Sequence, residues 1–244
     1  MYTLFISDLH LDGSHPDAIV QFESFLAGPA RGAEALYILG DLFESWIGDD
    51  DDDPDRERVC RALRALGEAG VACHVGHGNR DFLLGHGFEL RAGCRILGDP
   101  TVIERYGQRV LLTHGDALCT GDVFYQRLRS TVRDPEWQRR FIRLPLATRR
   151  TLADAARQGS RAHTGMVAAD IMDASESAVV DVLRESAVRT LVHGHTHRPA
   201  VHEFLVDGAP ARRYVLGAWY EQGSYLRWDA DGFELRTLPR EPQH

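Results

Sequence analysis

The sequence contains no lysine, and all 28 of its basic residues are arginine. A Walker-A phosphate loop and a Schiff-base enzyme both need a lysine, so these two classes are excluded. Acidic residues outnumber basic ones, and the formal net charge is −8. Because nucleic-acid binding depends largely on neutralising phosphates, we expect no nucleic-acid partner.

Cysteines are few, and none forms a C-x-x-C pair: they are Cys60, Cys73, Cys94 and Cys119. This excludes a zinc ribbon and a dithiol redox centre and predicts buried free thiols in a cytoplasmic protein. No apolar run approaches the length of about 18 residues that a membrane span needs, so we expect no transmembrane helix. The first residues lack the features of a secretory signal, and we expect the mature protein to start at Met1.

Short apolar runs alternate with helical patterns, which predicts one large α/β domain over residues 1–244. The runs each end in a polar or glycine-bearing cluster, as buried strands do, and cover residues 3–6, 35–39, 71–75, 110–112 and 190–192. The helical patterns cover residues 16–26, 56–70 and 175–186. Short strands at about 201–206, 213–216, 223–228 and 233–238 indicate a second sheet packed on the first.

Residues 122–173 differ from the rest, because they read as consecutive helices without a strand and are rich in arginine. Ten arginines lie between Asp122 and His163, against four acidic residues. This basic helical insertion predicts an anionic ligand or surface as its partner. The acidic run at residues 49–53 is interpreted as a solvated loop outside the site.

Side chains that commonly ligate metals follow the predicted strands. Asp8 and His10 are one residue apart, so at the end of an extended strand both would point the same way and could share a metal. Asp41 ends the next strand, and its two oxygens could bridge two ions. His195 and His197 repeat the alternate spacing.

Asn79 adds a neutral oxygen and His114 another imidazole, giving a nitrogen and oxygen set without thiolate. Such a set suits manganese, iron or zinc better than calcium. A single histidine at a strand end is more often a hydrogen-bonded structural residue. Five strand ends that each supply a ligand-type residue favour a shared metal site.

The ordered motifs Asp-x-His, Gly-Asp, Gly-Asn-Arg-Asp, His-Gly-Asp and Gly-His-Thr-His resemble those of the calcineurin-like metallophosphoesterases. The resemblance covers essentially the whole core and implies a β-sandwich flanked by helices. It also implies two metal ions, one held by Asp8, His10, Asp41 and His197 and the other by Asp41, Asn79, His114 and His195.

One position of this chain departs from the superfamily's Gly-Asn-His-Asp/Glu motif. Where the superfamily has the histidine, this chain has Arg80. A histidine can protonate a poor leaving group, whereas a guanidinium stays charged and only stabilises negative charge. A phosphate leaving group needs no such acid. We therefore hypothesise that the site cleaves a pyrophosphate linkage, with Asp41, Arg80 and His114 as catalytic residues.

Longer segments resemble a narrower family, the UDP-2,3-diacylglucosamine pyrophosphohydrolases of lipid A biosynthesis. The segments are residues 5–10, 40–50, 78–82, 113–116, 171–173 and 194–199. The resemblance runs from residue 1 to about residue 238. It implies an enzyme with two Mn²⁺ ions that hydrolyses UDP-2,3-diacylglucosamine to UMP and 2,3-diacylglucosamine 1-phosphate (lipid X).

The same resemblance implies substrate contacts from Asn79, Arg80, Asp122, Tyr125, Arg157, Ser160, Thr164, Val167 and His195. The helical insertion would act as a lid over the acyl chains. Since such a substrate resides in a membrane, we expect peripheral association with the cytoplasmic face of the inner membrane through the insertion. No protein partner is predicted.

Three alternatives stay open. The insertion could be an ordinary helical cap with solvated arginines. The chain could be another calcineurin-like hydrolase that acts on soluble nucleotides. It could also be a scaffold that has kept the fold and lost catalysis.

Overall fold

Two β-sheets face each other in the computed structural model. The structure describes residues 1–166, 173–219 and 223–238, without the side chains of residues 161–166. The first sheet has the order β11-β10-β1-β2-β3-β4. Its strands are β1 (Thr3–Ile6), β2 (Ala35–Ile38), β3 (Ala72–Val75), β4 (Arg95–Ile96), β10 (Ser224–Asp229) and β11 (Gly232–Thr237). The second has the order β5-β6-β7-β9-β8. Its strands are β5 (Thr101–Arg105), β6 (Gln108–Leu112), β7 (Thr190–His193), β8 (Ala200–Val206) and β9 (Ala209–Val215).

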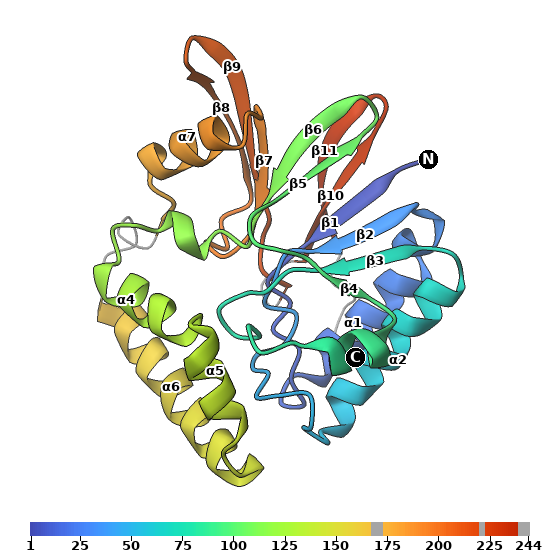
Figure 1. The fold of residues 1–244 in the computed structure, drawn as a ribbon. Coiled ribbons are helices and arrows are strands. Elements are labelled where there is room, and N and C mark those ends of the chain that lie inside the picture. The colour runs from blue at the N-terminus through green and yellow to red at the C-terminus, as the bar shows by residue number, and fades with distance from the viewer. Residues whose placement is uncertain (167–172, 220–222, 239–244) are drawn as a thin grey trace.

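The central strands β1 to β4 run parallel, and β1 and β2 are buried along their whole length. Strands covered on both faces consist of continuous apolar residues, which is why these runs were visible in the sequence. Between the sheets lies one apolar core, in which Phe5 and Tyr37 of the first sheet meet Leu112 and Tyr214 of the second. The predicted β-sandwich is confirmed (Figure 1).

Helices cover the outer faces of both sheets. The helices α1 (Pro16–Ala27), α2 (Pro54–Glu68) and α3 (His86–Ala92) pack on the first sheet, and α7 (Glu176–Glu185) packs on the second (Figure 1). Asp53 begins α2 by accepting hydrogen bonds from the N–H groups of Asp55 and Arg56. No helix in the described part of the chain is long and apolar enough to cross a membrane.

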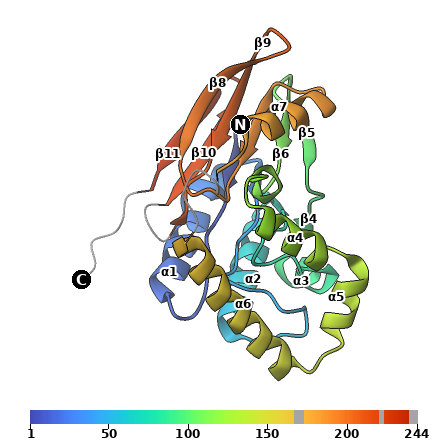
Figure 2. The same ribbon diagram turned by 90° about the vertical axis from the view of Figure 1, so that its left-hand side faces the viewer.

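The insertion forms three consecutive helices, α4 (Val123–Val132), α5 (Pro135–Ile142) and α6 (Leu146–Met166), which we call the lid. They lie together on one side of the molecule (Figure 2). The described part of residues 122–173 contains no strand, as predicted. Asp122 and Asp134 begin α4 and α5, where their carboxylates accept backbone hydrogen bonds.

The interpretation of residues 49–53 as a solvated loop is only partly right, because Asp50 and Asp52 are exposed but Asp51 is buried. Asp51 is 3% exposed and forms ion pairs with Arg56 and Arg150. Asp50 pairs with Arg149, a buried side chain of α6 that also donates to Ile47 O at 2.6 Å. The acidic loop therefore anchors the lid to the core, because each of these carboxylates has a cationic partner.

The expectation for the last strands was only partly right. Both sheets exist, but β8 and β9 join the second sheet, whereas β10 and β11 pair beside β1 in the first. The four predicted free thiols are buried and unpaired by disulfides. Neither α3 nor β5 was predicted, since α3 is short and the residues of β5 are only partly buried.

Candidate metal centre

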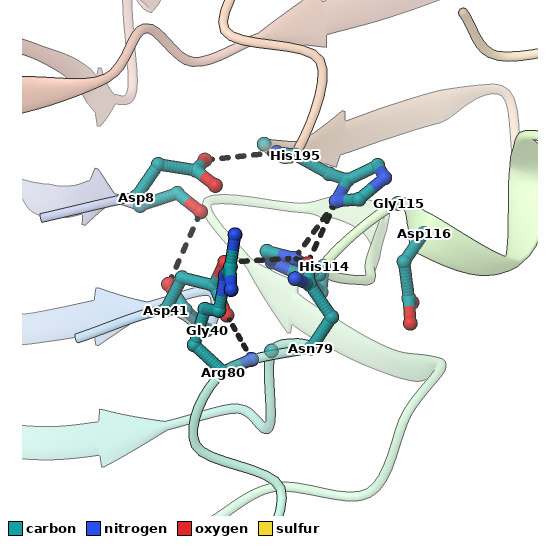
Figure 3. Close-up of polar contacts among 12 residues, drawn as sticks. Asp8, Gly40, Asp41, Asn79, Arg80, His114, Gly115, Asp116 and His195 are labelled. Atoms are coloured by element: carbon teal, nitrogen blue, oxygen red, sulfur yellow. Dashed lines mark hydrogen bonds and ion pairs between the residues drawn. The ribbon is translucent and has the colours of Figure 1, made fainter. Parts of the chain in front are cut away.

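The predicted ligands lie at one edge of the sandwich, because each follows the carboxyl end of a parallel strand. Asp8 and His10 follow β1, Asp41 follows β2, Asn79 follows β3, His114 follows β6, and His195 and His197 follow β7. Figure 3 shows the polar side chains of Asp8, Asp41, Asn79, His114 and His195 directed toward one another. The structure thus brings together all seven predicted ligands.

The backbone reaches this arrangement through left-handed turns. Five of the seven residues have positive φ: Asp8 (57°), His10 (50°), Asp41 (51°), His195 (66°) and His197 (57°). The expectation that Asp8 and His10 would alternate along an extended strand is therefore wrong. Each such residue costs of order 1–3 kcal/mol, and this strain commonly occurs where side chains must be aimed at a site.

A first group consists of Asp8, His10 and His197, whose ligand atoms all lie within 4.8 Å of one another. His197 Nε2 is 3.3 Å from Asp8 Oδ1. His10 Nε2 is 3.6 Å from Asp41 Oδ2, so a second carboxylate borders the group. Two imidazoles and two carboxylates at these separations can converge on one divalent ion.

A second group contains Asp8, Asp41 and His114, again within 4.8 Å. Asn79 Oδ1 lies 2.9 Å from both His114 Nε2 and His195 Nδ1, and these two nitrogens are 3.2 Å apart. Three atoms with lone pairs thus surround one point, which fits a cation. With neither group containing a thiolate, the donor sets fit a pair of first-row divalent metals.

The electrostatics favour a cation in the same place. Burial alone would lower the pKa of His114, but the carboxylates of Asp41 and Asp8 raise it to about 9. Burial, together with the positive charge on His114, lowers the pKa of His195 to about 4. The carboxylates therefore stabilise one positive charge, which a proton on His114 or a metal ion can supply. A histidine ligates as neutral imidazole, so metal binding displaces that proton.

Supporting residues fix how the ligands point. His114 Nδ1 donates to Leu39 O at 2.9 Å, which leaves Nε2 facing the site. Glu44 Oε2 lies 3.0 Å from His10 Nδ1 and does the same for His10. The sequence reasoning missed Glu44, which is the third residue after Asp41 and carries no spacing signal of its own.

Asp81 is also missed, although it lies in a quoted motif. Its buried carboxylate accepts hydrogen bonds from the N–H groups of Asp41 (3.2 Å), Leu42 (2.8 Å) and Gly78 (2.8 Å). It therefore joins the loop after β2 to the loop after β3. Asp81 was quoted as part of the Gly-Asn-Arg-Asp motif, but no role was predicted for it. Its role depends on the positions of backbone N–H groups, which the sequence alone does not reveal.

The predicted catalytic and substrate residues Arg80 and Ser160 meet at the boundary of core and lid. The Arg80 N–H donates to Asp41 Oδ1 at 2.8 Å, and its guanidinium Nη2 lies 3.4 Å from Ser160 Oγ of α6. Arg157, one turn earlier on α6, pairs with Asp12 at 3.5 Å. Arg80 is thus held beside the candidate metal ligands.

The predicted contacts on α4 lie beside His195 and Asp116. The Tyr125 ring stacks on His195 with centroids 5.9 Å apart, and its hydroxyl donates to Asp116 Oδ2 at 2.6 Å. Asp122 is buried and accepts a hydrogen bond from the Tyr125 N–H. The Thr164 side chain and Val167 lie outside the described residues.

Comparisons with known proteins show which family the chain belongs to. Residues 1–199 match the family model of the calcineurin-like phosphoesterases. The UDP-2,3-diacylglucosamine hydrolase of Pseudomonas aeruginosa is 52% identical over 239 residues, covering 98% of this chain and 100% of that protein. The hydrolase of the same name from Aeromonas hydrophila is 53% identical over 227 residues, covering 93% and 94%. A solved archaeal phosphodiesterase superposes with a TM-score of 0.51 at 13% identity, covering 98% and 100%, and shows likeness of fold alone.

Proposed function

We propose the function on the premise that the chain belongs to the calcineurin-like phosphoesterases and, among them, to the UDP-2,3-diacylglucosamine hydrolases. The chain then cleaves the pyrophosphate of UDP-2,3-diacylglucosamine. The products would be UMP and 2,3-diacylglucosamine 1-phosphate, an intermediate of lipid A biosynthesis. The observation that carries the proposal is that residues from five strand ends bring their ligand atoms together in two adjoining groups, which share Asp8. The chain is accordingly a metal-dependent hydrolase.

The proposal includes two Mn²⁺ ions. Asp8, His10, Asp41 and His197 would hold one, and Asp41, Asn79, His114 and His195 the other. When bound, the ions would lower the pKa of a water molecule and neutralise charge on the phosphate oxygens. The mixed nitrogen and oxygen donors support this choice of metal over calcium.

Arg80 would bind the pyrophosphate. Its backbone is tied to Asp41, and its guanidinium remains charged at any physiological pH. A fixed positive charge stabilises a leaving phosphate more than it stabilises the uncleaved diester, because negative charge develops on that group. Further substrate contacts are proposed for Asn79, Asp122, Tyr125, Arg157, Ser160, Thr164, Val167 and His195.

The lid would contact the acyl chains and the membrane surface. Five large apolar side chains of the lid region are 37–57% exposed: Val123, Leu128, Ile142, Leu144 and Leu152. They lie among arginines, a combination that suits an anionic lipid surface. We therefore propose peripheral association with the cytoplasmic face of the inner membrane.

A vesicle experiment tests the membrane proposal. Ile142→Ser with Leu144→Ser should weaken co-sedimentation with vesicles of phosphatidylglycerol and phosphatidylethanolamine. Val201→Ser with Leu205→Ser, which removes apolar residues of β8 that are even more exposed, is the control. Equal sedimentation of the two double variants would contradict the lid as the docking surface.

The activity is tested by incubating the protein with UDP-2,3-diacylglucosamine and Mn²⁺ and measuring UMP. A chelator should abolish UMP release, and added Mn²⁺ should restore it. Arg80→Ala should lower kcat by about 10²-fold or more if it stabilises the leaving group. Metallated protein that releases no UMP, or that cleaves soluble UDP-sugars equally fast, would overturn the assignment.

A further inference from the structure

Helix α4 presents three side chains, each four residues apart, to the candidate metal centre. Tyr125 stacks on His195. Arg129 Nε donates to Asp116 Oδ2 at 2.8 Å. Arg133, at the end of the helix, reaches the loop between β3 and α3. Residues at this spacing share one helix face, so one face of the lid contacts three loops around the centre.

Arg133 makes its closest contacts with backbone carbonyls. Its Nη2 donates to Gly78 O at 2.9 Å and to His77 O at 3.3 Å. The guanidinium also lies over the Phe82 ring, 5.8 Å from the centroid, and 3.8 Å from Asp116 Oδ2. The side chain is 18% exposed, so water competes little for these bonds.

Gly78 is held from the other side as well. Its N–H donates to Asp81 Oδ1 at 2.8 Å. A Cβ built on Gly78 would clash with Asp41 Oδ1, which shows how closely the backbone passes that carboxylate. Both polar backbone groups of Gly78 are thus fixed, one by the core through Asp81 and one by the lid through Arg133.

The next residue is Asn79, whose Oδ1 lies 2.9 Å from His114 Nε2 and from His195 Nδ1. The Gly78 carbonyl belongs to the peptide that joins Gly78 to Asn79, so its orientation sets the direction in which Asn79 leaves the loop. Removing Arg133 would remove the hydrogen bond that this carbonyl accepts, and with it one restraint on the orientation of the peptide.

We propose that Arg133 is a positioning residue of the metal centre: it fixes the Gly78–Asn79 peptide so that the Asn79 amide oxygen faces His114 and His195. The lid would then be part of the metal centre and not only a cover for substrate. This inference rests on the proposed function in assuming that Asn79 is a metal ligand. Loss of such an outer contact typically costs 10–100-fold in metal affinity or activity.

The test compares Arg133→Met with Arg127→Met, which removes an exposed arginine from the same helix. Titration calorimetry with Mn²⁺ alone should show one ion bound about 10–100-fold more weakly by Arg133→Met and no change in Arg127→Met. kcat should fall by a larger factor than KM rises, because in this role Arg133 acts on the reaction only through the metal ligand Asn79. Arg133→Lys, which can donate to one carbonyl, should recover part of the affinity.

Unchanged Mn²⁺ affinity in Arg133→Met, or an equal loss in both variants, would overturn the proposal. Should Arg133→Met not fold, Arg133→Gln undergoes the same titration and decides in the same way. The titration needs no substrate, so it also separates the two proposals. Wild-type protein that binds Mn²⁺ but releases no UMP would contradict the function and leave the role of Arg133 measurable.

Discussion

Glu44 lies directly behind His10, with its Oε2 3.0 Å from His10 Nδ1. Burial alone would lower the pKa of His10, but this hydrogen bond and the charge of Asp41 raise it. The carboxylate makes Nδ1 the protonated nitrogen and leaves Nε2 facing Asp41 and the centre.

Glu44→Gln should therefore weaken Mn²⁺ binding by about 10-fold or more, because an amide is a poorer acceptor and does not fix the ring tautomer. Titration calorimetry measures the affinity. Glu23→Gln, which breaks an ion pair with Arg58 on the surface, is the control and should bind Mn²⁺ normally. Equal affinities in the two variants would rule out an orienting role for Glu44.

Asp81→Asn should destabilise the fold. The amide replaces one acceptor oxygen by a donor, which would face either the N–H groups of Asp41 and Gly78 or the N–H group of Leu42. The free energy of unfolding in urea, measured without added metal, should fall by about 1–3 kcal/mol. Asp231→Asn, on an exposed turn, should change it little, and a similarly small change in Asp81→Asn would contradict this account.

Arg149→Met should loosen the lid without unfolding the core. It removes the hydrogen bond to Ile47 O and the pairing with Asp50, leaving a buried carbonyl without its donor. Hydrogen exchange should accelerate in α6 and stay slow in β1 and β2. Arg143→Met, at an exposed position, is the matched control. If exchange in α6 accelerated equally in both variants, Arg149 would not anchor the lid to the core.

His74→Phe should make stability less sensitive to acid. Burial, and then the charges of Arg105 and Arg95, lower the pKa of His74 below its ordinary 6.5, so the folded chain keeps this ring neutral. As the pH falls below 6.5, His74 becomes protonated in the unfolded chain but stays neutral in the folded chain. The free energy of unfolding therefore decreases. Phenylalanine cannot titrate and can keep the stacking on Tyr37.

The measurement is the free energy of unfolding in urea at about pH 7 and about pH 5, which bracket the ordinary histidine pKa. The difference between the two values should be smaller for His74→Phe than for wild type. His86→Phe, at an exposed position on α3, serves as the control. An identical pH dependence in His74→Phe and wild type would contradict the lowered pKa.

The sequence predicted the elements whose signal is local. The apolar run at residues 3–6 became β1 with the same bounds, because a strand buried on both faces needs apolar residues throughout. The pairing of Arg149 with Asp50 was not predictable, since 99 residues separate them and each is unremarkable alone. Asp8 and His10 were predicted to lie together, but the left-handed turn that places them has no signature in their spacing.

The left-handed backbone of five candidate ligands implies a trade-off between stability and activity in this protein. These residues are Asp8, His10, Asp41, His195 and His197. Glycine at any of these positions relieves the backbone conformation, and at Asp8 or Asp41 it also removes a buried negative charge. A screen for heat resistance alone would therefore enrich inactive chains. Directed evolution of this hydrolase has to select for turnover in every round.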